Sequence, residues 1–292
     1  MNYYSNIQKA IEYIESNLAN SLSLFEISDV SGYSIPHFYR IFGAMVGCTV
    51  KEYIRMRRLS NAVIDIITTK RSILDIALDC GYSSNEAFSR IVKDIYGYSP
   101  KQIRKNNYEP KLFEKINLLS TKIKHEVIIM EPAILFKGPI TLIGISRQLN
   151  QGKNVKNNLI SKIQLDFNGM VSTIKNRVNK DLFYSAYDYD PKDIATLEDD
   201  DINYTFYYCV EVSDSSDIPE NMVAKVIPQA KYAQFTYDIS EKTLNGEPLD
   251  MDIYDYIDGV WLPNSGFELS DSSDYEVINK ANNTIEYYVS IK

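Results

Sequence analysis

Two arginines, Arg40 and Arg90, occupy matching places in two copies of one sequence pattern near the start of the chain. An arginine guanidinium presents a planar fork of donors that fits O6 and N7 of guanine in the DNA major groove. The first arginine follows Gly32-Tyr33-Ser34, and the second follows Gly81-Tyr82-Ser83, which lies 49 residues later. A repeat at a nearly fixed spacing indicates one supersecondary unit used twice. The residues therefore favour a chain that reads base edges at two places.

Other side chains able to read bases stand close to these arginines. The second copy offers Asn85, Glu86 and Ser89. Asn can pair with adenine and Glu can accept from cytosine. The first copy offers a different set, so we expect the copies to read different half-sites: Pro36, His37 and Tyr39. Basic residues that would hold the phosphate backbone follow in the next helices: Lys51, Arg55, Arg57, Arg58 and Lys101.

Each copy must fold as helix, glycine-centred turn and helix, because a recognition helix reads the groove with its first two turns. Apolar spacing and capping residues predict recognition helices from Pro36 to about Val46 and from about Asn85 to Tyr96. A long helix from Thr49 to about Ile67 would join the copies. The alternative is a helical repeat that serves packing or protein contact.

The second copy continues through Phe88, Arg90, Lys93, Gly97, Ser99-Pro100 and Arg104. With the first copy, this order resembles the AraC/XylS transcription regulators over about residues 5–106, and most closely their MarA/Rob-like branch. The resemblance implies two recognition helices that enter adjacent major grooves of bent DNA. Pro36 stands where that branch has a base-contacting tryptophan, and Tyr39, Asn85 and Glu86 replace glutamines. The DNA site should therefore differ from those of the relatives.

After residue 107 the helical spacing gives way to segments rich in Ile, Val, Tyr and Phe, and 14 of the 23 tyrosines lie there. These segments predict a mostly antiparallel sheet with helices at about 155–178 and 254–262. Tyrosines on alternating strand positions can line a cavity for aromatic or cationic ligands, although tyrosine is also simply a good strand former. The predicted strands are 126–130, 140–149, 182–189, 204–212, 223–227, 232–237, 275–279 and 285–291.

The stretch Trp261-Leu262-Pro263-Asn264-Ser265-Gly266, followed by Asp274-Tyr275-Glu276-Val277, is similar to the GyrI-like (SOUL-type) effector-binding domains over about residues 125–292. The resemblance implies a pocket for bulky, often cationic aromatic compounds. It places Glu276 as the acidic pocket residue and Trp261 as the aromatic residue beside it. The positions of other tyrosines on the predicted strands add three further candidates: Tyr207, Tyr187 and Tyr232.

The composition of the 292 residues favours two domains of different charge. Residues 1–107 carry +3 and residues 108–292 carry −11. We expect a multidomain chain with an all-α double helix-turn-helix domain at 1–107, a polar and partly mobile linker at 108–124, and an α+β effector-binding domain at 125–292. Because no export signal or membrane-spanning run is visible, we expect a cytoplasmic, nucleoid-associated protein without membrane contact.

No catalytic or nucleotide-binding motif is visible, and neither His37 nor His125 has metal-ligand spacing to a cysteine. We therefore expect no catalytic residues, metal or cofactor. The sequence predicts a ligand-responsive transcription regulator, most simply an activator, with three partners: double-stranded promoter DNA, a small-molecule effector and RNA polymerase. Two alternatives stay open, namely a constitutive DNA-binding regulator whose second domain binds a protein, and a GyrI-like hydrolase fused to a DNA-binding domain.

Overall fold

The computed structural model describes residues 2–106, 108, 110–120, 130–150, 157–189, 203–249 and 251–292. The described residues form two compact units, a helical unit within residues 2–120 and a mainly β unit within residues 130–292. The predicted strand at 126–130 lies outside the described residues except for Met130. Along the described parts of the chain, no helix combines the length and apolarity needed to cross a membrane.

The helical unit contains the two predicted helix-turn-helix copies, joined by one long helix. The two recognition helices, α3 and α6, end alike, because Gly47 and Gly97 adopt left-handed φ angles of 79° and 80° that favour glycine. The second copy begins at the predicted cap, where the Ser72 hydroxyl accepts from the amide of Asp75 at 3.0 Å. The helices are α1 (Tyr3–Ser16), α2 (Leu24–Ser31), α3 (Ile35–Val46), α4 (Val50–Thr68), α5 (Ile73–Asp79), α6 (Asn85–Tyr96) and α7 (Pro100–Asn106).

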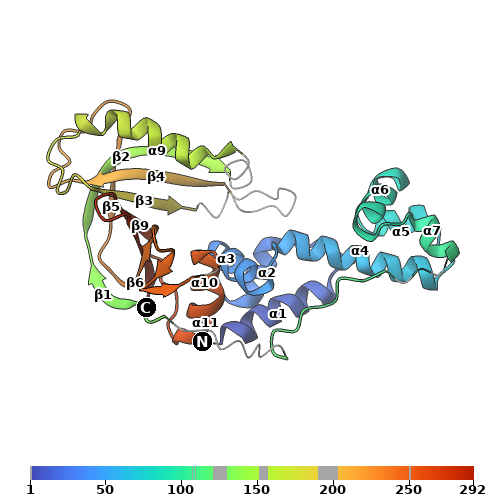
Figure 1. Cartoon of the computed structure of the whole chain (residues 1–292). Helices are drawn as coiled ribbons and strands as arrows, with labels where there is room; N and C mark the ends of the chain where they lie inside the picture. The colour runs from blue at the N-terminus through green and yellow to red at the C-terminus, as the bar shows by residue number, and fades with distance from the viewer. Residues whose placement is uncertain are drawn as a thin grey trace. The chain divides into compact units, whose positions relative to one another are not determined.

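After α7 the chain turns back and runs beside α4 toward α1, as Figure 1 shows for residues 110–120, here called the return segment. The Phe113 amide donates to Ser60 on α4, and the Leu118 amide donates to Gln8 on α1. This segment lies within the predicted linker at 108–124. Its described residues pack on the helical unit because their backbone groups and apolar side chains find partners there.

The β unit contains one antiparallel sheet in the order β5-β2-β4-β3-β9-β10-β6-β7-β8, with β1 paired to β6. The predicted strands within the described residues are confirmed, while the short strands β1, β7 and β8 were not predicted. The strands are β1 (Ala133–Lys137), β2 (Ile140–Asn150), β3 (Leu182–Asp188), β4 (Asn203–Glu211), β5 (Val223–Ile227), β6 (Ala230–Asp238), β7 (Thr243–Leu244), β8 (Glu247–Pro248), β9 (Tyr275–Asn279) and β10 (Thr284–Ile291).

One face of this sheet, here called the helix face, carries two sets of helices. The first is α9 (Leu159–Met170) with a 3-10 turn (Val171–Thr173), and its Phe167 packs against Phe183 and Tyr208. The second is α10 (Ile253–Tyr256), a π-helical turn (Ile257–Trp261) and α11 (Leu262–Ser265). Its Trp261 meets the ring of Phe235 edge-on, with 5.0 Å between centroids.

The helix predicted at 155–178 is shorter in the structure. The helical geometry ends with the 3-10 turn at Thr173. Beyond it, Asn176 has a left-handed φ of 60°, and Arg177 forms a β-bridge with Val212. The opposite side of the sheet is here called the tyrosine face. None of the described helices of the β unit packs on it. Its buried cluster contains Tyr184, Tyr232, Tyr275 and Tyr288.

Candidate functional site

The structure places all eight predicted base-reading residues in the first two turns of α3 and α6. Pro36, His37, Tyr39 and Arg40 lie on α3, and Asn85, Glu86, Ser89 and Arg90 lie on α6. Buried aromatic residues fix the two helices in the same way, because Phe38 and Phe88 are fully buried at corresponding positions. Each arginine comes two residues after its phenylalanine. Both arginines therefore point away from the buried side of their helix at the same angle about the helix axis.

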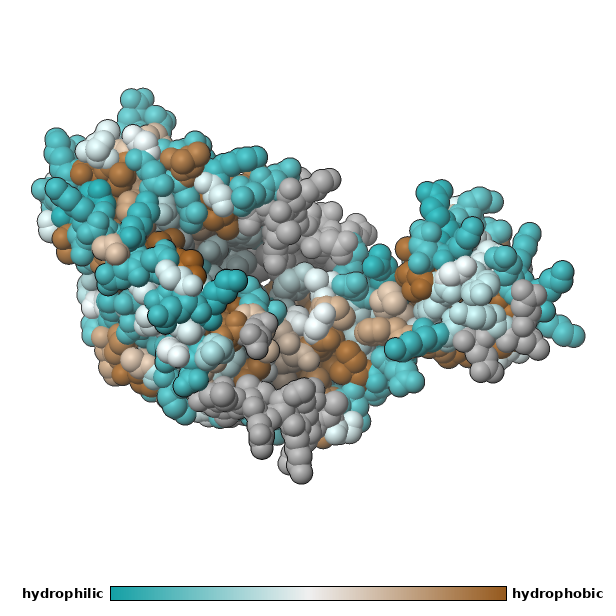
Figure 2. Space-filling model, in the orientation of Figure 1, coloured by the Kyte–Doolittle hydropathy of each residue, from teal (hydrophilic) through white to brown (hydrophobic). Residues whose placement is uncertain are grey.

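On α6 one hydrogen bond joins two of the predicted base-reading residues. The Ser89 hydroxyl donates to Oδ1 of Asn85 at 3.2 Å, which limits the rotation of the amide. Glu86 and Arg90 are exposed. In Figure 2 the surface in the region of α6 is mostly hydrophilic on the face in view. This surface can donate to and accept from polar groups of a partner.

The predicted phosphate-binding residues divide into two groups. Lys51 and Lys101 lie in the first turns of α4 and α7, which follow the two recognition helices. Arg55 is exposed and lies 3.8 Å from Glu52 on its own helix. These three remain candidates for phosphate contact.

Two other arginines of α4 are used inside the helical unit instead. Arg57 forms an ion pair with Glu15 at 2.8 Å, and both side chains are largely buried. Arg58 donates to the carbonyls of Leu18 and Asn20, each at 2.8 Å. Their position on the helix aims these guanidinium groups at α1 and the chain after it, so the expectation that they hold phosphates is corrected.

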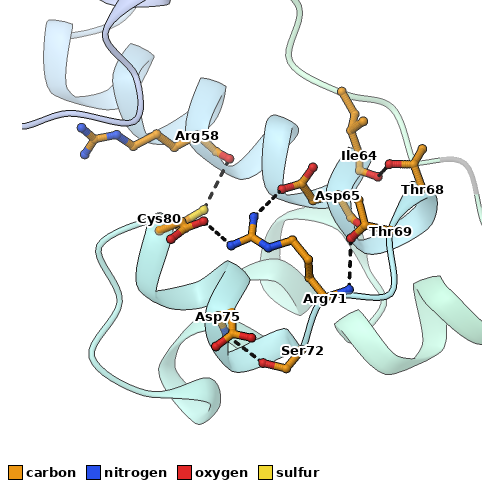
Figure 3. A network of polar contacts seen from close by, with 10 residues as sticks. Arg58, Ile64, Asp65, Thr68, Thr69, Arg71, Ser72, Asp75 and Cys80 are labelled. Carbon is orange, nitrogen blue, oxygen red and sulfur yellow. Dashed lines mark hydrogen bonds and ion pairs between the residues drawn. The ribbon is translucent and has the colours of Figure 1, made fainter.

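A network of polar contacts joins α5 to α4, as Figure 3 shows. Arg71 pairs with Asp65 of α4 at 3.1 Å and with Asp79 of α5. The Cys80 thiol contacts the carbonyl of Arg58 at 3.6 Å. These contacts join α5 to α4, although exposed ion pairs of this kind add little stability.

In the β unit, Glu276 stands in the middle of a row of side chains on the helix face. Directly paired residues of antiparallel strands point to the same side of a sheet. Pairing therefore aligns six residues from six neighbouring strands, in the order Phe235, Tyr287, Glu276, Ser185, Tyr208 and Ile145. The row places one carboxylate among aromatic rings, which is an arrangement suited to a cation with apolar surface.

Burial raises the pKa of Glu276 to about 7, because the carboxylate is largely withdrawn from water. Hydroxyls of Tyr187 and Ser185 oppose this shift, and the charge of Asp252 adds to it. The Tyr187 hydroxyl donates to Glu276 Oε1 at 3.3 Å, and burial in turn holds the pKa of Tyr187 well above its usual range. Among the ion pairs between described residues, none joins Glu276 to a Lys or Arg.

Trp261 is not the aromatic residue next to Glu276. It is 1% exposed and packs between Phe235 and Phe267. Phe235 and Glu276 are separated by β10 in the row, and two strand spacings amount to about 10 Å. The structure instead gives the adjacent place to Tyr287, whose ring meets that of Tyr254 edge-on at 5.6 Å.

Tyr207 and Tyr232 do not join this group, because the strand register turns them to the tyrosine face. Tyr207 lies under the Lys225 ammonium, 4.2 Å from its ring centroid, and Tyr232 packs against Tyr275 at 5.2 Å. Of the five predicted effector residues, the structure thus brings together Glu276 and Tyr187. The sequence missed Ser185 and Tyr287, the two residues paired with Glu276, and only the pairing of strands distant along the chain could have identified them.

No group of three or more His, Cys, Asp or Glu residues is placed to hold a metal ion in the described parts of the chain. Cys209 is fully buried, and burial raises the pKa of its thiol to about 12. A thiol in this state is a poor nucleophile and a poor ligand at neutral pH.

Two protein families match the chain, one in each half. Residues 27–106 match the family described as a helix-turn-helix domain. Residues 134–291, more than half of the chain, match the family described as integron-associated effector binding protein.

The helical half is similar to YbfP of Bacillus subtilis, named an uncharacterized HTH-type transcriptional regulator, with 43% identity over 104 residues. That match covers 36% of this chain and 35% of YbfP, so the chain spans about a third of the length of this relative. The HTH-type transcriptional activator AarP of Providencia stuartii is 39% identical over 100 residues, covering 34% of this chain and 74% of AarP. The β half is similar to the structure of an integron cassette protein of Vibrio cholerae, with 15% identity, a TM-score of 0.38, and coverage of 56% of this chain and 96% of that one.

Proposed function

The chain belongs to the AraC-type helix-turn-helix regulators and to the integron-associated effector binding proteins, and from this premise we propose a transcription regulator that responds to a bulky cationic ligand. DNA is bound by the helical unit, with α3 and α6 reading two successive major grooves. The ligand is bound by the β unit on its helix face. RNA polymerase is the proposed partner, and activation is the proposed sign because the relative AarP is named an activator.

The observation that carries the ligand proposal is the state of Glu276. Its carboxylate is largely withdrawn from water, lies beside Tyr187 and Tyr287, and has no Lys or Arg ion-pair partner among the described residues. A buried charge without a partner is costly to the folded protein. A cationic aromatic ligand would neutralise this charge and stack on the neighbouring rings, so binding would relieve the cost.

The DNA proposal rests on the matching geometry of the two recognition helices. Each presents an arginine in its second turn, and each is followed by a helix with a lysine in its first turn, Lys51 or Lys101. The reading residues differ between the copies, so one chain would recognise an asymmetric site.

A thermal shift assay with tetraphenylphosphonium tests the ligand proposal. A ligand that binds only the folded state stabilises it by about 2.7 kcal/mol when the ligand concentration is a hundredfold above the dissociation constant. This stabilisation raises the melting temperature. We expect a rise for the wild type and for Glu286→Gln, a matched carboxylate change on the tyrosine face, but not for Glu276→Gln. Triphenylphosphine oxide, which has similar rings and no net charge, should give little shift.

If the ligand raises the melting temperature of Glu276→Gln as much as that of the wild type, Glu276 is not part of the ligand site. The regulatory claim needs its own test, in which a promoter found by genomic footprinting drives a reporter with and without the cation. Higher reporter output in the presence of the cation supports ligand-responsive activation. Unchanged output despite binding in the thermal assay would favour a constitutive regulator.

A further inference from the structure

The return segment is docked along its length on both helix-turn-helix units. Just before it, the ring of Tyr108 lies 4.1 Å from that of Tyr98, next to α7. Leu112 packs against the apolar core of the second unit. Further along, Leu118 is buried, and its amide donates at 2.9 Å to the buried Gln8 of α1. A flexible linker would leave these amides and apolar side chains in water.

Phe113 is the centre of this docking. Its amide donates to the Ser60 hydroxyl at 3.0 Å, and its carbonyl accepts a hydrogen bond from the guanidinium of Arg57. Its ring meets Tyr53 edge-on, with 5.7 Å between centroids. All three partners lie on α4, so one residue of the return segment fixes the segment to the helix that joins the two units.

The same three partners reach both units. The Ser60 hydroxyl shares a hydrogen bond of 3.1 Å with the Tyr96 hydroxyl of α6. Arg57 donates to both carboxylate oxygens of Glu15 on α1, at 2.8 Å and 3.0 Å, and Tyr53 donates to Glu15 at 2.9 Å. A continuous set of polar contacts therefore runs from the second recognition helix to the first helix of the chain, and the backbone of Phe113 stands in the middle of it.

We propose that the return segment is a brace that holds the two recognition helices at a fixed spacing, and that residues 110–118 belong functionally to the DNA-reading unit. Two successive major grooves lie one helical turn apart, so both helices engage together only if their separation is fixed. If α4 were the sole connection, the two helix-turn-helix units could move relative to each other as this helix bends. The return segment is a second connection alongside α4, and it resists that bending. The spacing itself follows from the contacts of Phe113 and Leu118, while its use in reading DNA rests on the proposed function.

The first test measures the spacing without DNA. Spin labels are placed at the exposed Glu26 of α2 and Asp94 of α6 in the full chain through an unnatural amino acid, and their distance is measured by double electron–electron resonance. We expect one narrow distance distribution for the wild type and for Leu119→Ala, which removes an exposed leucine of the same segment. The variant Phe113→Ala/Leu118→Ala should give a distribution at least twice as broad. An unchanged width would overturn the brace.

The double variant must keep its helices by circular dichroism for this comparison to stand. Should it unfold, hydrogen exchange on the wild type decides instead, because the amides of Phe113 and Leu118 should be protected as strongly as those of α4. Fast exchange at both amides would show that the segment is not docked, and the brace would be abandoned.

The second test uses DNA selected by the wild type from a random duplex library, with and without five base pairs inserted between the half-sites. Loss of fixed spacing lowers the effective concentration of the second unit, so the double variant should bind the contiguous site about tenfold more weakly. Its affinity for the inserted site should change less than twofold. An equal loss on both sites would refute the role in spacing. If the wild type selects no sequence, the proposed DNA function fails, while the resonance experiment still decides the brace.

Discussion

Replacing Glu276 by glutamine should make the ligand-free β unit more stable at high pH, even though the same change removes the proposed ligand response. The folded protein holds the pKa of this carboxyl at about 7, above its ordinary value of 4.5. A carboxyl with a raised pKa binds its proton more tightly in the folded state. Its stabilising contribution is therefore fully present below the unfolded pKa and is lost as the pH rises through the folded pKa.

The size of the effect follows from that difference. Each pKa unit corresponds to 1.36 kcal/mol, so the ionised carboxylate destabilises the folded state by about 3 kcal/mol at pH 8 and by very little at pH 4. Glutamine has nearly the same shape and no charge. We expect Glu276→Gln to exceed the wild type in unfolding free energy by about 3 kcal/mol at pH 8, with the difference shrinking toward zero at pH 4.

The chain offers a specific probe for this measurement, because Trp261 is its one tryptophan and lies fully buried in the β unit. Urea unfolding followed by tryptophan fluorescence at pH 4, 5, 6, 7 and 8 therefore reports on this unit. Glu241→Gln, at an exposed position, serves as the control and should follow the wild type throughout. If Glu276→Gln is destabilised, or if its difference from the wild type does not change with pH, the argument from carboxylate burial is wrong.

Three further predictions follow from the described contacts. Arg40→Ala and Arg90→Ala should each weaken specific DNA binding by about 1–3 kcal/mol and relax the base preference of one half-site, measured by quantitative footprinting; an unchanged footprint in both would refute the assignment of the repeat. Tetraphenylphosphonium affinity should fall about tenfold from pH 8 to pH 6 as Glu276 takes up its proton, measured by titration calorimetry, and a flat profile would exclude this carboxylate as its counter-charge. Glu15→Ala leaves Arg57 largely buried without its ion-pair partner and should lower the stability of the helical unit by about 3 kcal/mol in chemical unfolding followed at 222 nm, whereas a loss within error would show the pair to be dispensable.

Much of the helical unit was predictable because its signals are local. The two Gly-Tyr-Ser turns, the capping residue Ser72 and the apolar spacing each act within a few residues of the chain. The repeat placed Arg40 and Arg90 at matching positions on two helices, and the structure agrees because a helix fixes the angle between residues by their spacing alone.

The roles of neighbouring arginines were less predictable for the same reason. Arg55, Arg57 and Arg58 are alike in sequence, but α4 turns only Arg55 to the surface and directs the others at partners contributed by α1 and its flanking residues. The return segment lies in a stretch predicted from the sequence to be a polar linker, although residues 110–120 include Phe113 and Leu118. Its docking depends on the amides of Phe113 and Leu118 and on the side chains of the same two residues, whose partners on α4 and α1 lie far away along the chain.

The sequence by itself determined the two-part architecture, the helix-turn-helix repeat, the longer strands and the presence of a distinctive carboxylate at Glu276. Only the tertiary structure decided which residues surround that carboxylate. Alternation along a strand divides its residues between two faces, but it does not say how neighbouring strands are aligned or which face the helices cover. Register placed Tyr187 and Tyr287 beside Glu276, sent Tyr207 and Tyr232 to the other face, and set Phe235, on which Trp261 packs, two strands from Glu276.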